Sequence, residues 1–130
     1  MPDDIPSEEI DDIKRIMEGY IGDFTNVDNN ISKLVKNSVI KDQQLESYDE
    51  NTQNLILENR DKALSTGFIA ISTMALIIRR FRSAAKLSSL FIQLVNRFVS
   101  LITKHVRLFK IESIQFTVSL TPSIVIVFKS

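Results

Sequence analysis

The chain of 130 residues contains no cysteine, no tryptophan and a single histidine. Without cysteine, the chain cannot form disulfides, zinc ribbons, iron–sulfur clusters or thiol nucleophiles. His105 is the one candidate general base, and the acid nearest to it in sequence is Glu112. Because it also lies between Lys104 and Arg107, we predict no enzyme activity, no metal site and no cofactor.

Glycine and proline are scarce, with three of each. Gly19, Gly22 and Gly67 are the only glycines, so the chain has no glycine-rich loop that could cradle phosphates, which excludes the usual nucleotide-binding enzymes. The composition is 44% hydrophobic and 25% charged, as in folded proteins. We therefore expect one folded and mostly helical unit.

Acidic residues are absent from a long stretch of the chain. No Asp or Glu lies between Asp61 and Glu112, and this stretch carries nine Lys or Arg. Residues 1–61 hold 15 acids and six bases, a net charge of −9, whereas residues 62–130 hold one acid and ten bases, a net charge of +9. This division indicates that one half folds onto the other, that copies associate head to tail, or that the basic half faces an anionic partner.

The acidic half has the pattern of a long helix. We expect Ser7 to cap it, with carboxylates in the first turn where the helix dipole favours them. The glycines at 19 and 22 and the Asn-rich stretch after them favour a bend or short interruption near residues 19–30.

Apolar residues in this helix recur with spacings of 3 and 4, which predicts a heptad seam of the coiled-coil type. The seam continues weakly to about residue 60. One helix of that length would span about 80 Å, so the chain must fold back or bind partners. We expect an oligomer interface at Ile10, Ile13, Met17, Tyr20, Phe24, Val27, Ile31 and Leu34.

Residues 63–78 contain no charge. Such a segment is either a core helix of a folded protein or a membrane-inserted helix. As a helix it would be about 24 Å long, whereas the hydrocarbon layer of a membrane is about 30 Å thick. Arginines follow at once, and their long side chains can reach lipid headgroups.

Residues 82–110 have a polar stripe along an otherwise apolar helix, and the stripe is basic. This pattern is typical of a helix buried on two sides or of one lying in a membrane interface. We expect the bases of this half to contact an anionic partner or membrane through Arg79, Arg80, Arg82, Lys86, Arg97, Lys104 and Arg107.

The C-terminal residues change to an alternating pattern, with Ile114 and Phe116 separated by polar residues and a second apolar run at 124–128. This predicts a β-hairpin with a three-residue loop at 121–123. Two strands alone are marginal in water. The hairpin must therefore rest on the helices or join strands from other copies.

Together these patterns predict a mainly α fold: a heptad-patterned N-terminal helix, a basic apolar hairpin or continuous helix over 63–110, and a C-terminal β-hairpin. We expect three segments in one structural unit, with boundaries at 1–61, 62–111 and 112–130. The N-terminus has no secretory signal, which predicts synthesis in the cytoplasm.

The predicted function is that of a non-enzymatic structural protein that self-assembles or docks on a helical partner, as in a component of a virus or phage particle. A first alternative is a protein that inserts into or lies on an anionic membrane through residues 63–110. A second is a nucleic-acid-binding capsid or architectural protein that uses the arginines at 79–82. No small-molecule substrate is predicted.

Overall fold

The computed structural model describes residues 6–35, 44–80, 87–117 and 123–129. It is mainly helical and ends in an antiparallel hairpin, which confirms the predicted fold class. The elements in chain order are α1 (Ser7–Leu34), the short 3-10 helix η1 (Leu45–Ser47), α2 (Glu50–Arg80), α3 (Ser88–Lys104), β1 (Ile111–Thr117) and β2 (Ser123–Phe128).

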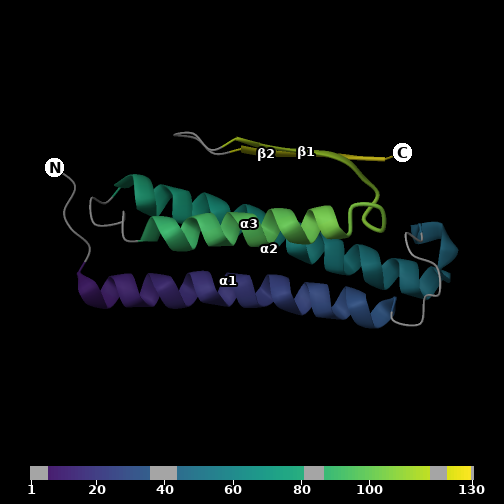
Figure 1. The fold of residues 1–130 in the computed structure, drawn as a ribbon, viewed down its shortest axis with the longest axis horizontal. Coiled ribbons are helices and arrows are strands. Elements are labelled where there is room, and N and C mark those ends of the chain that lie inside the picture. Colours follow the sequence, from purple (N-terminus) through teal and green to yellow (C-terminus); the bar gives the residue numbers. More distant parts are fainter. Residues whose placement is uncertain (1–5, 36–43, 81–86, 118–122, 130) are drawn as a thin grey trace.

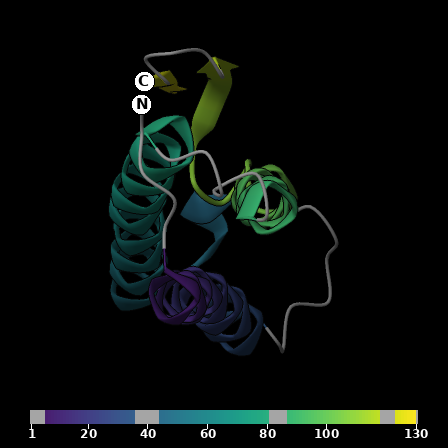
Figure 2. The same cartoon turned by 90° about the vertical axis from the view of Figure 1, so that its left-hand side faces the viewer.

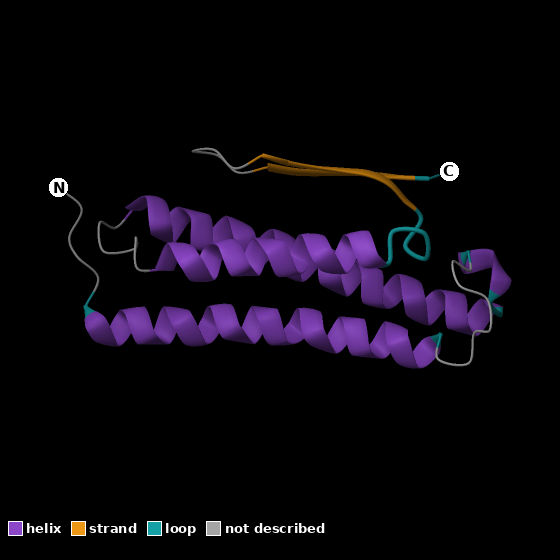
Figure 3. Cartoon of the chain, viewed as in Figure 1, coloured by secondary structure: helices purple, strands orange, loops and turns teal. Residues whose placement is uncertain are grey.

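The three long helices lie side by side and alternate in direction (Figure 1). Viewed along their axes they form a triangle, and the hairpin covers the side made by α2 and α3, opposite α1 (Figure 2). The hairpin strands run nearly parallel to the helices, as the orange arrows in Figure 3 show. The acidic α1 therefore packs against both helices that contain the acid-free stretch.

α1 starts one residue earlier than the predicted cap implies. Pro6 takes the cap position, and its carbonyl accepts hydrogen bonds from the N–H groups of Glu9 at 3.0 Å and Ile10 at 3.1 Å. The predicted Ser7 cap is therefore wrong. The helix then continues without the predicted interruption through Gly19 and Gly22 to Leu34. The packing of its buried face on two other helices outweighs the low helix propensity of the two glycines.

α2 begins at a well-formed cap that the heptad pattern did not predict. The carboxylate of Asp49 accepts a hydrogen bond from the N–H of Thr52 at 2.8 Å. Hydrogen bonds with the side chain and then with the N–H of Thr52 lower the pKa of Asp49 below its usual value. α2 then runs through the boundary expected at residues 61 and 62. If the heptad seam continued into α2, it would bury Leu55. The buried face of α2 is one residue out of phase with this expectation, because Ile56 is fully buried whereas Leu55 is 37% exposed.

α3 closes the core. Its buried residues Leu94, Phe98 and Ile102 face α1 and α2, and the rings of Phe24 and Phe98 lie 5.6 Å apart between centroids. Gly67 of α2 makes room for Phe98, since a Cβ at this position would collide with the Phe98 ring. Residues 63–110 thus form the helical hairpin of the two predicted alternatives, with residues 81–86 outside the described part.

The C-terminal hairpin pairs Thr117 with Ser123 and Phe116 with Ile124. Ser123, predicted to lie in the loop, is the first residue of β2, and the rest of that loop lies outside the described residues. One face of the hairpin packs on the core through half-buried Ile114, Phe116, Ile124 and Ile126. Two strands thus gain the apolar support that they lack alone.

Arg60 of α2 connects the helices to the base of the hairpin. Its Nη1 donates a hydrogen bond to the carbonyl of Phe109 at 3.1 Å, and its guanidinium lies 4.5 Å from the ring centroid of Phe128. Only 18% of its side chain is exposed. One side chain therefore holds both the turn before β1 and the end of β2.

Candidate interaction surfaces

The predicted oligomer seam lies in the interior of this chain. Of its eight residues, Ile10, Met17, Phe24, Val27 and Ile31 are buried, while Ile13, Tyr20 and Leu34 are half-buried against the same core. Their neighbours are on α2 and α3 of the same molecule. An oligomer built through this seam would have to displace those helices, so we place any interface elsewhere.

The seven predicted basic contact residues do not form one described patch. Arg97 and Lys104 are exposed on α3 beside α1, whereas Arg107 lies in the turn after α3. Arg79 and Arg80 end α2, but their side chains are not described. Arg82 and Lys86 lie outside the described residues.

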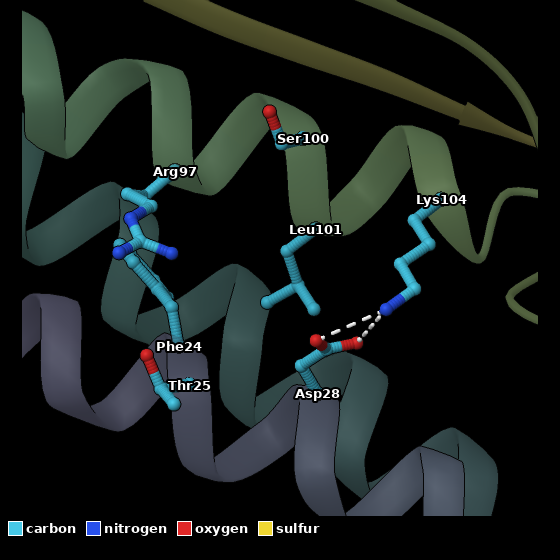
Figure 4. A pocket seen from close by; sticks show the side chains of 7 residues that line it. All are labelled: Phe24, Thr25, Asp28, Arg97, Ser100, Leu101 and Lys104. Atoms are coloured by element: carbon cyan, nitrogen blue, oxygen red, sulfur yellow. Dashed lines mark hydrogen bonds and ion pairs between the residues drawn. The ribbon is translucent and has the colours of Figure 1, made fainter.

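Asp28 of α1 is the centre of a polar cluster that the sequence did not predict. Nε2 of His105 lies 2.8 Å from Oδ1 of Asp28, and Nζ of Lys104 lies 3.1 Å from the same carboxylate. Figure 4 shows Lys104 reaching from α3 to Asp28 on α1. The His105 side chain is only 8% exposed, and its ring lies 5.5 Å from the ring of Phe109.

The surroundings of Asp28 favour its ionised form. Burial alone would raise its pKa, but the hydrogen bonds from His105 and Lys104 and the charges of these residues outweigh burial and lower it. The cluster joins an acid of the first half to two basic residues of the second half. It connects α1 to the C-terminal end of α3.

Asp28 and Lys104 of this cluster line a small groove between α1 and α3, with a volume of about 130 Å³. Phe24 and Leu101 supply its apolar lining, and Arg97 lines it from α3 (Figure 4). Thr25 and Ser100 add hydroxyls, but the only acid, Asp28, is bound to Lys104. No group of three potential metal ligands occurs among the described residues.

The outward side of α2 is apolar over its second half. We call the exposed residues of this uncharged side the outer α2 face: Ser65, Phe68, Ile69, Ser72, Thr73 and Leu76. Ile69 is 58% exposed and Leu76 is 55% exposed, large fractions for aliphatic side chains. In the described part of the chain, α2 is the one helix that is long and apolar enough to cross a membrane.

A second polar pocket lies where the turn after α3, η1 and the end of β2 meet. We call it the basic pocket, and its lining residues are Gln44, Glu46, Arg107, Lys110 and Lys129. Glu46 and Lys110 form an ion pair across it. Within this ion pair Lys110 donates a hydrogen bond to the carboxylate of Glu46, and this bond is the largest cause of the lowered pKa of Glu46.

Both pockets combine residues that are far apart in the sequence. Asp28 and Lys104 of the first are separated by 76 positions, and Glu46 and Lys110 of the second by 64, with no motif around them that indicates a pairing. The one available signal was the opposite charge of the two halves, which indicates that ion pairs form but does not identify them.

Comparisons with models of protein families, with curated proteins and with solved structures give no match to this chain. The function is therefore argued from these surfaces alone.

Proposed function

We propose that this chain is a non-enzymatic interaction protein that associates with a second copy of itself through the outer α2 face. The observation that carries the proposal is the exposure of Phe68, Ile69 and Leu76 on a side of α2 that has no charge. Exposed large apolar residues on one uncharged side of a helix, here separated only by serine and threonine, mark contact sites in small soluble proteins.

The internal use of the apolar faces of α1 and α3 supports the choice of α2 among the helices. On the hairpin, β2 also exposes Val125 and Val127, whereas the ring of Phe128 lies against Arg60. The seam of α1 and the buried side of α3 are both consumed in the core. Elsewhere on the helices, exposed large apolar residues stand singly, as Ile16 does on α1 and Ile92 on α3. Single residues of this type are common on protein surfaces and carry no interface.

The outer α2 face is also suited to a helix of the same kind. Large side chains at Ile69 and Leu76 alternate with small ones at Ser65 and Ser72 along one stripe of the helix. In a twofold dimer the large residues of one copy can enter the gaps over the small residues of the other. The single histidine, His105, is almost fully buried, which also agrees with a non-enzymatic role.

The test is the molecular mass in solution, measured by sedimentation velocity over a range of protein concentrations. Ile69→Asp places a carboxylate in the proposed interface, where an unpaired buried charge is costly, so we expect a shift to monomer. Ile16→Asp on α1 is the matched control, because Ile16 is 50% exposed but lies outside the face. It should keep the parental mass.

A parent chain that is monomeric at every concentration would contradict self-association through this face. An assembly that survives both Ile69→Asp and Leu76→Asp would do the same, and would place the interface on another surface. The melting temperatures of Ile69→Asp and Leu76→Asp should stay near that of the parent chain at concentrations where the parent is monomeric, because neither residue is part of the core.

An anionic membrane surface is the second candidate occupant of the same face. The observation that favours it is the length and apolar character of α2 together with the acid-free basic stretch in which its second half lies. In that case the parent should float with vesicles of anionic lipid more than with neutral ones, and added salt should weaken the attachment. The Ile69→Asp variant should lose this binding while Ile16→Asp retains it.

A further inference from the structure

The outer edge of β2 is open in the described part of the chain. The sheet there has two strands, so β2 pairs with β1 on one edge only. The N–H of Lys129 donates to the carbonyl of Lys110, on the side of β1, at 2.8 Å. Because alternate residues of a strand direct their backbone groups to opposite edges, those of Ile124, Ile126 and Phe128 point to the open edge. Figure 2 shows β2 over α2 and β1 nearer α3, so this edge faces away from α3.

β2 lacks the features that keep an exposed strand edge from pairing. Natural edge strands carry charges, proline or bulges. β1 has two of these features, because Glu112 is an exposed charge and the register shifts between Ile111 and Ser113. Over Ser123–Phe128, in contrast, β2 is regular, uncharged and rich in β-branched residues. The edge of β2 is therefore the one that favours pairing with another strand.

The strand that fits this edge is β2 of a second copy. Residues 113–128 contain no charge, so two copies of the strand can lie side by side without bringing like charges together. In an antiparallel arrangement centred on Ile126, Ile124 of one copy faces Phe128 of the other, and all the open backbone groups of both strands meet. Lys129 then lies beyond these pairs, opposite an uncharged residue.

The same arrangement brings exposed valines together. Val125 is 49% exposed and Val127 is 44% exposed, on the face of the hairpin opposite to the one that packs on the core. In the register centred on Ile126, Val125 of one copy lies opposite Val127 of the other, on both sides of the twofold axis. These β-branched side chains would cover one another, which is a favourable cross-strand pairing.

We propose that β2 pairs with β2 of a second copy, so that the two hairpins form one four-stranded antiparallel sheet. This contact links two copies and no more, because it uses both β2 edges while the bulge and Glu112 protect the outer edge of β1. The inference rests on the self-association proposed above. It does not rest on the outer α2 face, which is a separate surface of the molecule.

The first experiment tests the register by disulfide formation, since the chain contains no cysteine. Two single variants, Val125→Cys and Val127→Cys, are mixed in equal amounts under mild oxidation. Residues that face each other between the hydrogen-bonded pairs lie about 4.5 Å apart at Cα, a separation that a disulfide can span. The mixed disulfide should form about tenfold faster than one between Gln115→Cys and Val127→Cys, because Gln115 is exposed but lies on β1.

The second experiment measures the dissociation constant of the dimer by sedimentation velocity. Val127→Lys places a lysine twice in the interface and should raise this constant about tenfold or more, because lysine is a residue that natural edges use against pairing. Combining Val125→Lys with Val127→Glu in one chain sets opposite charges across the interface and should restore much of the association. Gln115→Lys adds the same charge on β1 and should leave the constant unchanged. All three positions are exposed, so circular dichroism should show the parental fold in every variant.

The proposal is overturned if the mixed disulfide forms no faster than the control disulfide, or if Val127→Lys and Gln115→Lys have equal effects. The first result would leave the edge to an extended segment of a different protein. Comparison with Ile69→Asp separates this inference from the outer α2 face. Loss of the dimer in Val127→Lys but not in Ile69→Asp supports the β2 edge and contradicts the outer α2 face, whereas the reverse contradicts the β2 edge alone.

Discussion

At the scale of single residues, the packing of α2 on α3 depends on the missing side chain of Gly67. A Cβ at this position would overlap the ring of Phe98, which is fully buried and cannot swing out of the core. The ring of Phe98 also contacts that of Phe24, so any shift would pass to α1. A glycine that lowers helix propensity thus lets the ring of Phe98 approach the backbone of α2 closely.

Gly67→Ala should therefore destabilise the protein by about 1–3 kcal/mol, the cost of overpacking a filled core. Gly19→Ala makes the same chemical change in open space on α1, where the gain in helix propensity should stabilise the protein by about 0.5–1 kcal/mol. Urea unfolding followed by circular dichroism measures both. Changes of the same sign in the two variants would contradict the packing role of Gly67.

The cluster at Asp28 predicts a loss of stability in acid. Because the pKa of Asp28 is lowered in the folded protein, its contribution is complete above the usual pKa of 3.8 and is lost as the pH falls through the folded value. Asp28→Asn should cost about 1–2 kcal/mol at neutral pH, a value reduced by the partial exposure of the carboxylate.

The measurement is the free energy of unfolding of Asp28→Asn and of the parent, from about pH 7 down to about pH 2. The difference between the two should shrink as the parent loses the charge. Asp23→Asn, an exposed position on the same helix, should show no such difference. A gap that stays constant over this pH range would show that the ionised carboxylate is not what stabilises the link.

At the scale of elements, the hairpin is held to the helices by apolar side chains and by Arg60. Removing Arg60 takes away a hydrogen bond to the Phe109 carbonyl and a cation–π contact with Phe128. Arg60→Ala should cost about 1–3 kcal/mol. In this variant, amide hydrogen exchange should accelerate relative to the parent in residues 111–117 and 123–128, and should accelerate much less in the helices.

Arg15→Ala is the matched control for this prediction. Arg60 pairs with the adjacent Asp61 at 3.0 Å. Arg15 forms a similar ion pair with Asp12, but 75% of its side chain is exposed, and exposed pairs contribute little. Its loss should change neither stability nor hairpin exchange. If amide exchange in Arg60→Ala accelerated equally over the whole chain, Arg60 would stabilise the whole fold and not the hairpin in particular.

The elements differ in how far the sequence predicted them. The spacing of Met17, Phe24 and Ile31 predicted α1 and its buried face, because a periodic apolar stripe reports burial directly. It did not identify the neighbour, since a stripe looks the same whether it packs on the same chain or on another. The phase of α2 was wrong because the chain leaves the helix after Leu34, and a new helix begins after Asp49 with its own rotation.

The candidate sites were predicted less well than the fold. The basic residues were identified by their number, but Arg107 joins Lys110 and Lys129 in one pocket only because the hairpin returns the chain to the end of α3. Pairings of this kind depend on tertiary structure and leave no local pattern. The exposed side of α2 could be assigned only after its buried side was known.

At the scale of the whole molecule, the three helices share one core, and the α1 seam is part of it. Phe24→Asp should therefore unfold the single chain and not merely separate copies. The loss of the buried ring alone costs about 3–5 kcal/mol, a large part of the usual stability of a small domain. Circular dichroism at low concentration tests this, and a variant that keeps its helix signal as a monomer would contradict it.

The contact between Phe24 and Phe98 has a consequence for synthesis of the protein on the ribosome. The two rings are 74 positions apart, and at about 5–20 residues per second the second follows the first after about 4–15 s. During that time the side of α1 that α3 will cover faces water. The part of the chain already made is also the part that holds 15 of the 16 acidic residues. The unfinished chain therefore carries a large negative charge, which favours its solubility until the basic half follows and neutralises it.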